Sequence, residues 1–429
     1  MGMETERTNM IYRDYAMHVG RIYLRGLKWI LFGILCGIFV GAISAEFANA
    51  IVFVTGFRLS HPRLIFFLPF AGLAIVFYYR LLGVRQPRGT NLVLEAIRTG
   101  DRVPGKMAPL IILSSILSHL FGASVGREGA ALQVGGSLGN LLGRVFHFRE
   151  NDRRQLIMCG MSAAFSALFG TPLAAAVLAM EISTVGNIYY FAFVPCVVSA
   201  LTAHLVAEFL GAKESAMLVN EVADFSAHSA LLTILFAFLC ALVSVLFCVS
   251  VHRIKALLNK CLENTYLRSF IAGIAVLSLT LAVGDQSYNG TGMHTIVSAV
   301  VDQGFRAAPY AFLLKILFTA LSLAGGFQGG EIVPSLFIGA VFGNAAACLF
   351  GMDPRLFSAI GMTCVFCGVT NCPIAALLIS CEMFGFQASS YFLMAVAITY
   401  LFSGNYGIYS AQKILYSKVS EEELNINAH

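Results

Sequence analysis

The chain has 429 residues, of which 58% are apolar and only 12% are charged. Soluble domains carry about 25% charged residues, so this composition excludes an ordinary soluble protein and predicts a chain dissolved mostly in lipid. The net charge of +5 does not indicate nucleic-acid binding, because the basic residues gather in short loops between apolar runs, as cytosolic loops of membrane proteins do.

The apolar residues form about a dozen segments, several of which are unsuited to a straight membrane crossing. A crossing helix needs about 20 apolar residues, and some segments are shorter, while 156–182 and 356–384 each hold a central proline. Short and interrupted helices turn their free backbone groups toward protein or a water-filled cavity, which predicts a transporter or channel. In chain order the predicted segments are 26–45, 64–82, 107–121, 131–143, 156–182, 187–211, 229–252, 269–283, 310–325, 333–350, 356–384 and 389–403.

The flanking residues complete the predicted domain plan. Residues 1–25 form a polar, basic head that we expect in the cytosol, and the run 26–45 that follows is expected to be a retained helix and not a signal peptide, because Leu31–Ala45 continues as a long helix. The transport domain is predicted over 26–415, with a short tail at 416–429.

An internal repeat divides this domain. The stretch "GMSAAFSALFGTPLAAAVLAME" (160–181) matches "GMTCVFCGVTNCPIAALLISCE" (361–382), with every identity 201 residues apart. The matched pairs are Gly160 with Gly361, Phe165 with Phe366, Pro172 with Pro373 and Glu181 with Glu382.

A second matched block precedes the first. "GREGAALQVGGSLGN" (126–140) resembles "GGEIVPSLFIGAVFGN" (329–344), and we expect Glu128 to correspond to Glu331 at a separation of 203 residues. The chain is therefore predicted to consist of two halves, about 20–210 and 225–415. The broken helices favour an inverted arrangement of the halves.

The glycine-rich breaks predict an anion site. Glycines before a short helix let backbone N–H groups converge at the positive end of the helix dipole, and one such helix start is expected in each half. Glu128 sits on the first of them, so its carboxylate can occupy the site when the mobile anion is absent and can carry a proton when it leaves. The alternative is a structural ion pair between Arg127 and Glu128, but charges inside membrane segments are functional by default.

At these motifs the sequence resembles the CLC family of chloride channels and anion/proton antiporters, over nearly the whole chain. "GREGA" is similar to the family's G-[KR]-E-G-P, "GGEIVP" to G-G-x-F-x-P, and "NYGIYSAQKIL" (405–415) to the last family helix. The resemblance implies that Glu128 is the gating glutamate and that Tyr409 binds the central anion. It also implies an anion path lined by Gly126, Arg127, Glu128, Gly129, Ile332 and Val333.

The resemblance implies an architecture as well. It predicts an all-α, multi-pass protein of the bacterial inner or plasma membrane, with many tilted, partial helices in two inverted halves. It further implies a homodimer in the lipid bilayer with one pore per subunit, and no cytosolic CBS module of the kind that many eukaryotic relatives carry.

One departure concerns the anion-binding serine of the family's G-S-G-I-P motif. The corresponding stretch reads "RQPRGTNLVLEAI" (85–97). Gly89 matches the second glycine, which places Arg88 where the serine belongs, and Thr90 is a nearby hydroxyl that can substitute. Arg88 is equally interpretable as a cytosolic loop charge.

A second departure concerns the inner proton glutamate. Glu181 lies on the corresponding helix but one residue early, with Ile182 in the expected place. Because Glu181 repeats as Glu382, helix capping is an alternative role for both.

Glu331 favours the fluoride/proton branch of the family, which lacks the serine and carries an acidic residue in the second-half motif. A second carboxylate there can pass a proton on from the first. Ala130 and Val333 differ from the threonines that this branch carries.

The leading hypothesis is exchange of a halide, chloride or fluoride, for protons, and the alternative is a passive chloride channel of the same fold. An enzyme is not expected, and no metal or cofactor is predicted. The histidines stand apart, and the pair Cys364 and Cys367 has no matching second pair. A neutral-solute transporter does not need glycine-framed helix starts in both halves.

Overall fold

The computed structural model describes every residue except 1, 85–86, 102, 213–216, 220–221 and 223. The described chain is mostly helical, as predicted. The first half contains α1 (Gly2–Ser60), α2 (Leu68–Leu81), α3 (Asn91–Thr99), α4 (Met107–Phe121), α5 (Glu128–Val145), α6 (Glu150–Phe169), α7 (Pro172–Glu181) and α8 (Phe193–Phe209). The second half contains α9 (Ala227–Cys261), α10 (Thr265–Val283), α11 (Met293–Val301), α12 (Ala311–Gly325), α13 (Ile332–Phe350), α14 (Pro354–Thr370), α15 (Pro373–Phe384) and α16 (Ser389–Phe402). Short 3-10 helices at Pro62–Phe67, Tyr190–Ala192 and Phe386–Ala388 precede α2, α8 and α16.

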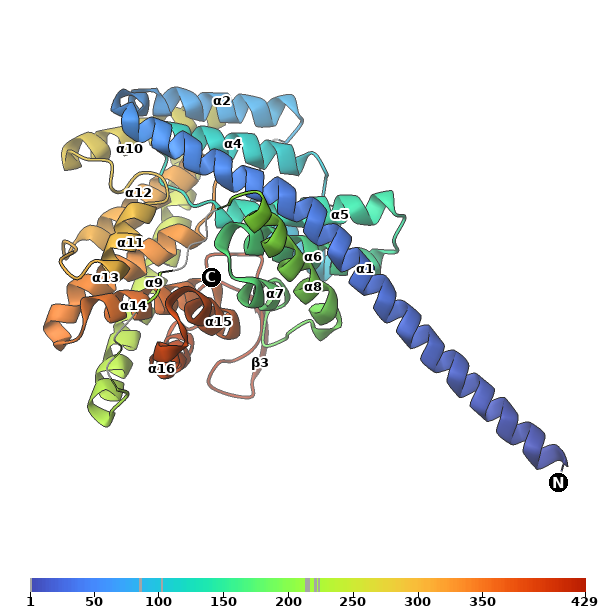
Figure 1. Cartoon of the computed structure of the whole chain (residues 1–429). Coiled ribbons are helices and arrows are strands. Elements are labelled where there is room, and N and C mark those ends of the chain that lie inside the picture. Colours follow the sequence, from blue (N-terminus) through green and yellow to red (C-terminus); the bar gives the residue numbers. More distant parts are fainter. Residues whose placement is uncertain (1, 85–86, 102, 213–216, 220–221, 223) are drawn as a thin grey trace.

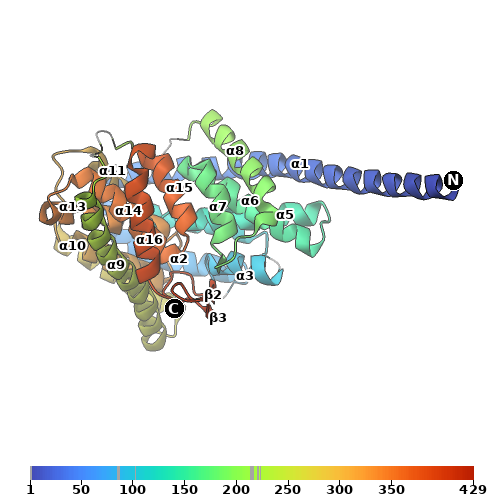
Figure 2. The same ribbon diagram turned by 90° about the horizontal axis from the view of Figure 1, so that it is seen from below.

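The order and pairing of these helices repeat between the halves. Helices α3 and α11 each have 9 residues, and α4 and α12 each have 15. Helix α5 packs on α6 as α13 packs on α14, and α1 packs on α8 as α9 packs on α16. The halves meet where α7 packs against α15 and α2 against α10, so the blue-to-green and yellow-to-red parts lie side by side (Figure 1 and Figure 2).

The predicted helix breaks occur at the prolines. The segment 156–182 divides into α6 and α7, and 356–384 divides into α14 and α15, with Pro172 and Pro373 each in the first turn of the second helix. Gly170 and Asn371 end the preceding helices in the left-handed conformation, with φ of 72° and 56°. Each proline lacks the N–H that a helix interior needs, so the chain restarts there.

Close helix packing depends on glycines at matched positions. A Cβ atom at Gly135 of α5 would collide with the carbonyl oxygen of Gly160 on α6, and one at Gly339 of α13 with that of Gly361 on α14. Small residues let membrane helices approach until their backbones touch. This contact explains why Gly160 and Gly361 recur at the same place in the repeat.

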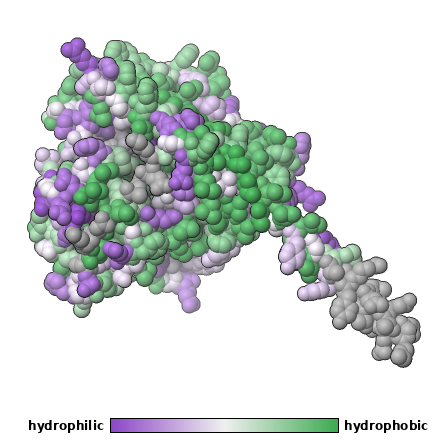
Figure 3. All heavy atoms as spheres, in the orientation of Figure 1, coloured by the Kyte–Doolittle hydropathy of each residue, from purple (hydrophilic) through white to green (hydrophobic). Residues whose placement is uncertain are grey.

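Helix α1 differs from the expectation. It runs unbroken from Gly2 to Ser60, so residues 2–25 are continuous with the run 26–45, and its N-terminal part extends away from the body (Figure 1 and Figure 2). Six helices in the described chain, α1 and α13 among them, contain stretches long and apolar enough to cross a membrane. Hydrophobic side chains cover the face around α1 and α8 (Figure 3).

The all-α expectation omitted a small sheet. Strand β1 (Thr184–Val185) pairs in parallel with β2 (Lys413–Tyr416), which pairs antiparallel with β3 (Glu423–Asn427). The stretch 416–429 is therefore folded against the body, and the amide of Ala428 donates to the carbonyl of Gln412 at 2.9 Å. The sheet joins a loop of the first half to the end of the second.

The positions of the basic loops distinguish a cytosolic face of the protein from an outer face. Arg144 and Arg149 flank the α5–α6 turn, and Lys255 and Lys260 lie near the end of α9, so the positive-inside rule predicts that these ends face the cytosol. Helix α10 begins beside the end of α9 and is long enough to cross, so we expect its end at Val283 on the outer face.

Candidate functional site

The two glycine-rich breaks meet each other. Gly126 and Gly330 form an isolated antiparallel bridge, in which the Gly126 amide donates to Gly330 at 2.7 Å and the Gly330 amide donates to Gly126 at 2.6 Å. The bridge brings the N-termini of α5 and α13 together. Because the first amides of a helix have no acceptor within it, two sets of N–H groups and two positive dipole ends converge here.

Glu128 is the first residue of α5 and is fully buried. Its Oε2 accepts from the Arg127 amide at 3.0 Å, and its Oε1 accepts from Arg127 Nε at 3.1 Å. The Arg127 guanidinium also donates through Nη2 to the carbonyl of Leu168 at 3.3 Å. The carboxylate thus turns back onto the helix start, and the ion pair considered from the sequence is present.

Glu331 does not correspond to Glu128, contrary to the expectation from the sequence. The bridge pairs Gly126 with Gly330, α5 begins at Glu128 and α13 begins at Ile332. Glu331 is therefore the counterpart of Arg127, and both precede the first residue of their helix. A Cβ at Gly129 would lie 3.1 Å from Glu331 Oε2, and this oxygen is buried and accepts no hydrogen bond within the described residues.

Two further segments bring Tyr409 and Thr90 to the helix starts that carry Glu128 and Glu331. Tyr409, which is 1% exposed, lies in the segment after α16, and Thr90 is buried at the start of α3. The side chain of Thr90 faces the phenol, as do the carboxylates of Glu331 and Glu128. The Thr90 hydroxyl donates to Gly129 O at 3.3 Å, and the phenol oxygen has no hydrogen-bond partner of ordinary geometry within the described residues.

Thr90 and Arg88 have different surroundings. Arg88 has 57% of its side chain exposed and pairs with Glu95 at 2.7 Å. Gly89, which lies between Arg88 and Thr90, turns the chain with a φ of 60°. The structure does not bring Arg88 together with Glu128 and Tyr409. Ile332 and Val333, by contrast, are fully buried in the first turn of α13.

Two polar residues that sequence reasoning missed hold this arrangement. Gln133 Nε2 donates to Thr90 Oγ1 at 3.3 Å and to Gly129 O at 3.2 Å. Asn91 Oδ1 accepts from the Ala411 amide at 2.9 Å, which ties the Tyr409 segment to α3. Gln133 is one of three buried uncharged polar residues, with Ser137 and Asn140, in a helix rich in glycine and apolar residues, and polar residues in such a helix are a signal that the sequence did carry.

Glu181 and Glu382 cap each other's helices. Glu181 accepts from the amides of Ile374 and Ala375 at the start of α15, at 3.2 and 2.9 Å. Glu382 accepts from the amides of Leu173 and Ala174 at the start of α7, at 3.0 and 2.9 Å. The capping role inferred from the repeat is confirmed, and it is reciprocal.

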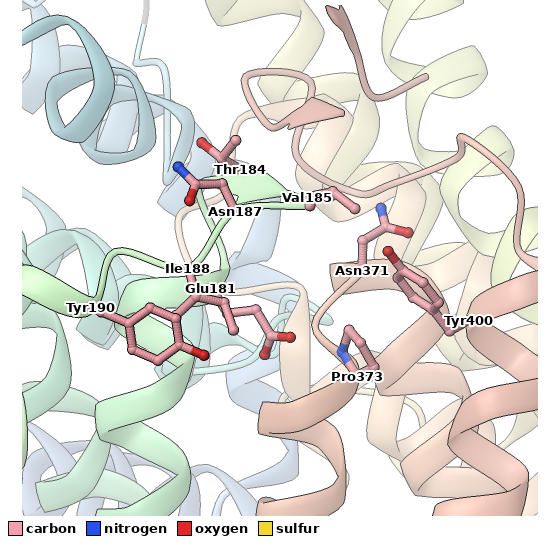
Figure 4. A pocket seen from close by; sticks show the side chains of 10 residues that line it. Glu181, Thr184, Val185, Asn187, Ile188, Tyr190, Asn371, Pro373 and Tyr400 are labelled. Atoms are coloured by element: carbon pink, nitrogen blue, oxygen red, sulfur yellow. The ribbon is translucent and has the colours of Figure 1, made fainter. Parts of the chain in front are cut away.

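Glu181 also lines a cavity of about 430 Å³, with Tyr190, Asn371 and Tyr400 on its walls. Its carboxylate points toward Pro373 at the start of α15 (Figure 4). Gln155 Nε2 on α6 donates to Phe191 O at 2.8 Å, so the Tyr190 side of this cavity lies near the start of α6, which follows the basic α5–α6 turn. Among the described residues, no cluster of three or more histidine, cysteine or acidic side chains has the arrangement of a metal site.

Comparison with known proteins places the whole arrangement in a family. The family described as voltage gated chloride channel matches residues 70–404. A chloride/fluoride channel protein of Pseudomonas syringae pv. tomato is 36% identical over 400 residues, which cover 91% of this chain and 87% of that protein. The H(+)/Cl(-) exchange transporter ClcA of Vibrio cholerae is 24% identical over 277 residues, covering 61% of this chain and 58% of the transporter.

Solved structures give the same result. The crystal structure of a CLC-type fluoride/proton antiporter superimposes with a TM-score of 0.88 at 31% identity, covering 91% of this chain and 99% of that one. A slow cyanobacterial Cl-/H+ antiporter shares the fold, with a TM-score of 0.74 at 18% identity over 87% of this chain and 94% of that one. The chain therefore belongs to the CLC family of voltage-gated chloride channels and is an integral membrane protein.

Proposed function

We propose that this protein exchanges a halide for protons across the membrane, with Glu128 as the gate and proton carrier. The observation that carries the proposal is the buried Glu128 carboxylate folded onto the N-terminus of α5, where it accepts the Arg127 amide at 3.0 Å. A carboxylate bound where helix amides converge is itself an anion, so an entering halide and the ionised side chain compete for the same donors. Protonation removes the charge of Glu128 and releases the donors to the halide.

The proposed anion path runs between the two helix starts. The amides of Gly129, Ile332 and Val333 face it at positive dipole ends, and the free hydroxyl of Tyr409 supplies a neutral donor. We assign Thr90 the place of the family's serine, because its hydroxyl is buried beside Tyr409 while Arg88 pairs with Glu95 at the surface. Partial charges hold an anion without trapping it, which transport requires.

We propose fluoride as the preferred cargo. The relative that is 36% identical is named for chloride and fluoride, and the structure at 31% identity is a fluoride/proton antiporter. Glu331 supports this choice, because one of its carboxylate oxygens lies beside Gly129 with no hydrogen-bond partner in the described chain. Such a carboxylate can receive a proton from Glu128.

Two routes can carry that proton to the cytosol. Glu331 is the first, and Glu181 is the second, because it borders the cavity whose Tyr190 side lies near the start of α6. Both oxygens of Glu181 accept helix amides, and we therefore propose Glu331 as the main carrier. If Glu331 carries no proton, Glu181 is the only other proposed carrier, and its oxygens are occupied by helix amides. The alternative function, a passive channel, is then favoured.

We further propose a homodimer with one pore per subunit and no enzymatic activity. Phe386 and Leu393, in the α15–α16 region, are 65% and 57% exposed, which leaves apolar surface for lipid or a second copy. The polar groups described above serve anion and proton binding.

Paired flux in liposomes tests the proposed function. Purified protein is placed in vesicles under an imposed fluoride or chloride gradient, while pH and halide are followed together. Uphill proton movement driven by fluoride supports the proposal, and the same result with chloride alone would change the cargo. Halide flux without proton movement would establish the channel alternative, and no halide flux would overturn both.

A further inference from the structure

Three basic side chains lie buried on the outer side of the gate. Lys315 on α12 and His119 on α4 are 0% exposed, and Arg58 near the end of α1 is 2% exposed. None of them forms a salt bridge within the described residues. The charged groups facing His119 are Arg58, Arg127 and Lys315, and Lys315 faces Arg58. Burial of charge without a counter-charge is costly, so the cluster of Arg58, His119 and Lys315 calls for an explanation.

Two of these cations hold one outer loop. Lys315 Nζ donates to the carbonyls of Tyr288 at 3.1 Å and Gly290 at 2.8 Å, and it lies 4.8 Å from the centre of the Phe337 ring. Arg58 Nη1 donates to Gln286 Oε1 at 2.6 Å. Both contacts reach the loop that follows α10, on the face opposite the basic cytosolic turns.

The same loop holds the segment that leads into the gate. The Gly290 amide donates to Ala123 O at 3.0 Å, and Asn289 Nδ2 donates to Gly122 O at 2.8 Å. Ser124 follows, and its amide donates to Ser322 Oγ at 3.0 Å. Three residues later the chain reaches Arg127, so the loop that Arg58 and Lys315 bind also holds the segment that leads to the start of α5.

The cluster retains an unused donor. Arg58 Nε is buried and has no hydrogen-bond partner within the described residues. His119 Nδ1 donates to Ser115 O at 2.7 Å, so the neutral ring presents the lone pair of Nε2, which accepts hydrogen bonds and does not donate them. The two cations and the free N–H of Arg58 suit a small, hard anion, and His119 adds no donor.

We propose that Arg58 and Lys315 form an outer halide site, distinct from the site at Tyr409, where the anion binds before it displaces the Glu128 carboxylate. The inference rests on the proposed function and extends it. Because the two cations are in low-dielectric surroundings, their attraction for an anion is stronger than that of exposed charges. The site therefore sets the affinity on the outer side and leaves the inner side unaffected.

The test compares the two sides of the membrane. Right-side-out and inside-out membrane vesicles give the half-saturating fluoride concentration on each side for Arg58→Gln and Lys315→Met. We expect the outer value to rise about ten-fold, equivalent to about 1.4 kcal/mol, with the inner value unchanged. Arg306→Gln is the control, because Arg306 is an exposed outer arginine bound to the carbonyls of Gln303 and Phe305.

The outcomes separate the two proposals. Unchanged half-saturation on both sides, or an equal shift on both sides, overturns the outer site while the proposed function stands. No halide movement by the unaltered protein overturns the proposed function and this inference with it. If Lys315→Met fails to fold because Tyr288 and Gly290 lose their donor, Arg58→Gln keeps those contacts and decides the question.

Discussion

The amide nitrogen of Gly126 lies 2.7 Å from the carbonyl oxygen of Gly330, and the Gly330 amide lies 2.6 Å from the carbonyl of Gly126. This reciprocal pair joins the two repeats at the point where α5 and α13 begin. Neither half contains the complete proposed anion site, because its donors come from both helix starts. The proposed site therefore lies at the interface between the halves.

A side chain at Gly330 should break this interface. A Cβ there would collide with the amide of Gly129, so Gly330→Ala is expected to lower halide flux by at least ten-fold and to reduce thermal stability. Flux in liposomes and a melting curve measure both. Gly56→Ala in α1 is the control, since its Cβ would meet nothing within 4 Å and alanine favours a helix.

Glu128→Gln should abolish proton movement and leave a halide leak. Glutamine keeps the size and a hydrogen-bonding oxygen of the side chain but cannot carry a proton. Simultaneous pH and halide recordings in liposomes measure the two fluxes. Glu95→Gln is the control, because Glu95 pairs with the exposed Arg88. This variant should leave the coupling of proton to halide flux intact. Proton flux that survives in Glu128→Gln would remove the residue from the gate.

Tyr409→Phe isolates the free phenol hydroxyl. Loss of one hydrogen bond to a charged ligand costs about 1.5–3 kcal/mol, so we expect halide affinity measured by calorimetry to fall by roughly ten-fold or more with the fold retained. Tyr409→Ala should add a loss of packing, because the ring is buried. Equal affinity in Tyr409→Phe and the unaltered protein would exclude the hydroxyl from the anion path.

Glu331→Gln should lower proton movement per halide transported, because the amide cannot accept a proton from Glu128. The variant keeps the side-chain volume beside Gly129, where Glu331 Oε2 lies, and halide flux is expected to persist. The ratio of proton to halide flux is the measurement. A normal ratio would make Glu331 a structural residue and return the proton route to Glu181.

Glu181→Gln and Glu382→Gln form a matched pair. Each removes a carboxylate that accepts two amides at a helix start, and each should cost about 1 kcal/mol of stability. Because we assign the main proton route to Glu331, the two variants should show the same proton-to-halide ratio. A lower ratio in Glu181→Gln alone would instead assign Glu181 to the proton path.

Much of the fold was predictable because glycine and proline act locally. A proline inside an apolar run interrupts the helix, as Pro172 and Pro373 do where α7 and α15 begin, and glycines such as Gly160 and Gly361 permit backbone contact that a side chain would block. The repeat, the helix breaks and the position of Glu128 at a helix start followed from such residues. The repeat offered helix capping as an alternative role for Glu181 and Glu382, and the structure added that each caps the helix of the other.

The sequence by itself determined the membrane class, the duplication and the glycine-framed helix starts, because composition and local backbone chemistry are enough for these. Only the tertiary structure decided that Glu331 is the counterpart of Arg127, that Thr90 and not Arg88 faces Tyr409, and that a strand from the C-terminal region pairs with the first half. Each of these relationships joins residues far apart in the chain. Spacing along one sequence carries no information on which distant backbone groups meet, because packing and hydrogen bonding between the halves set that register.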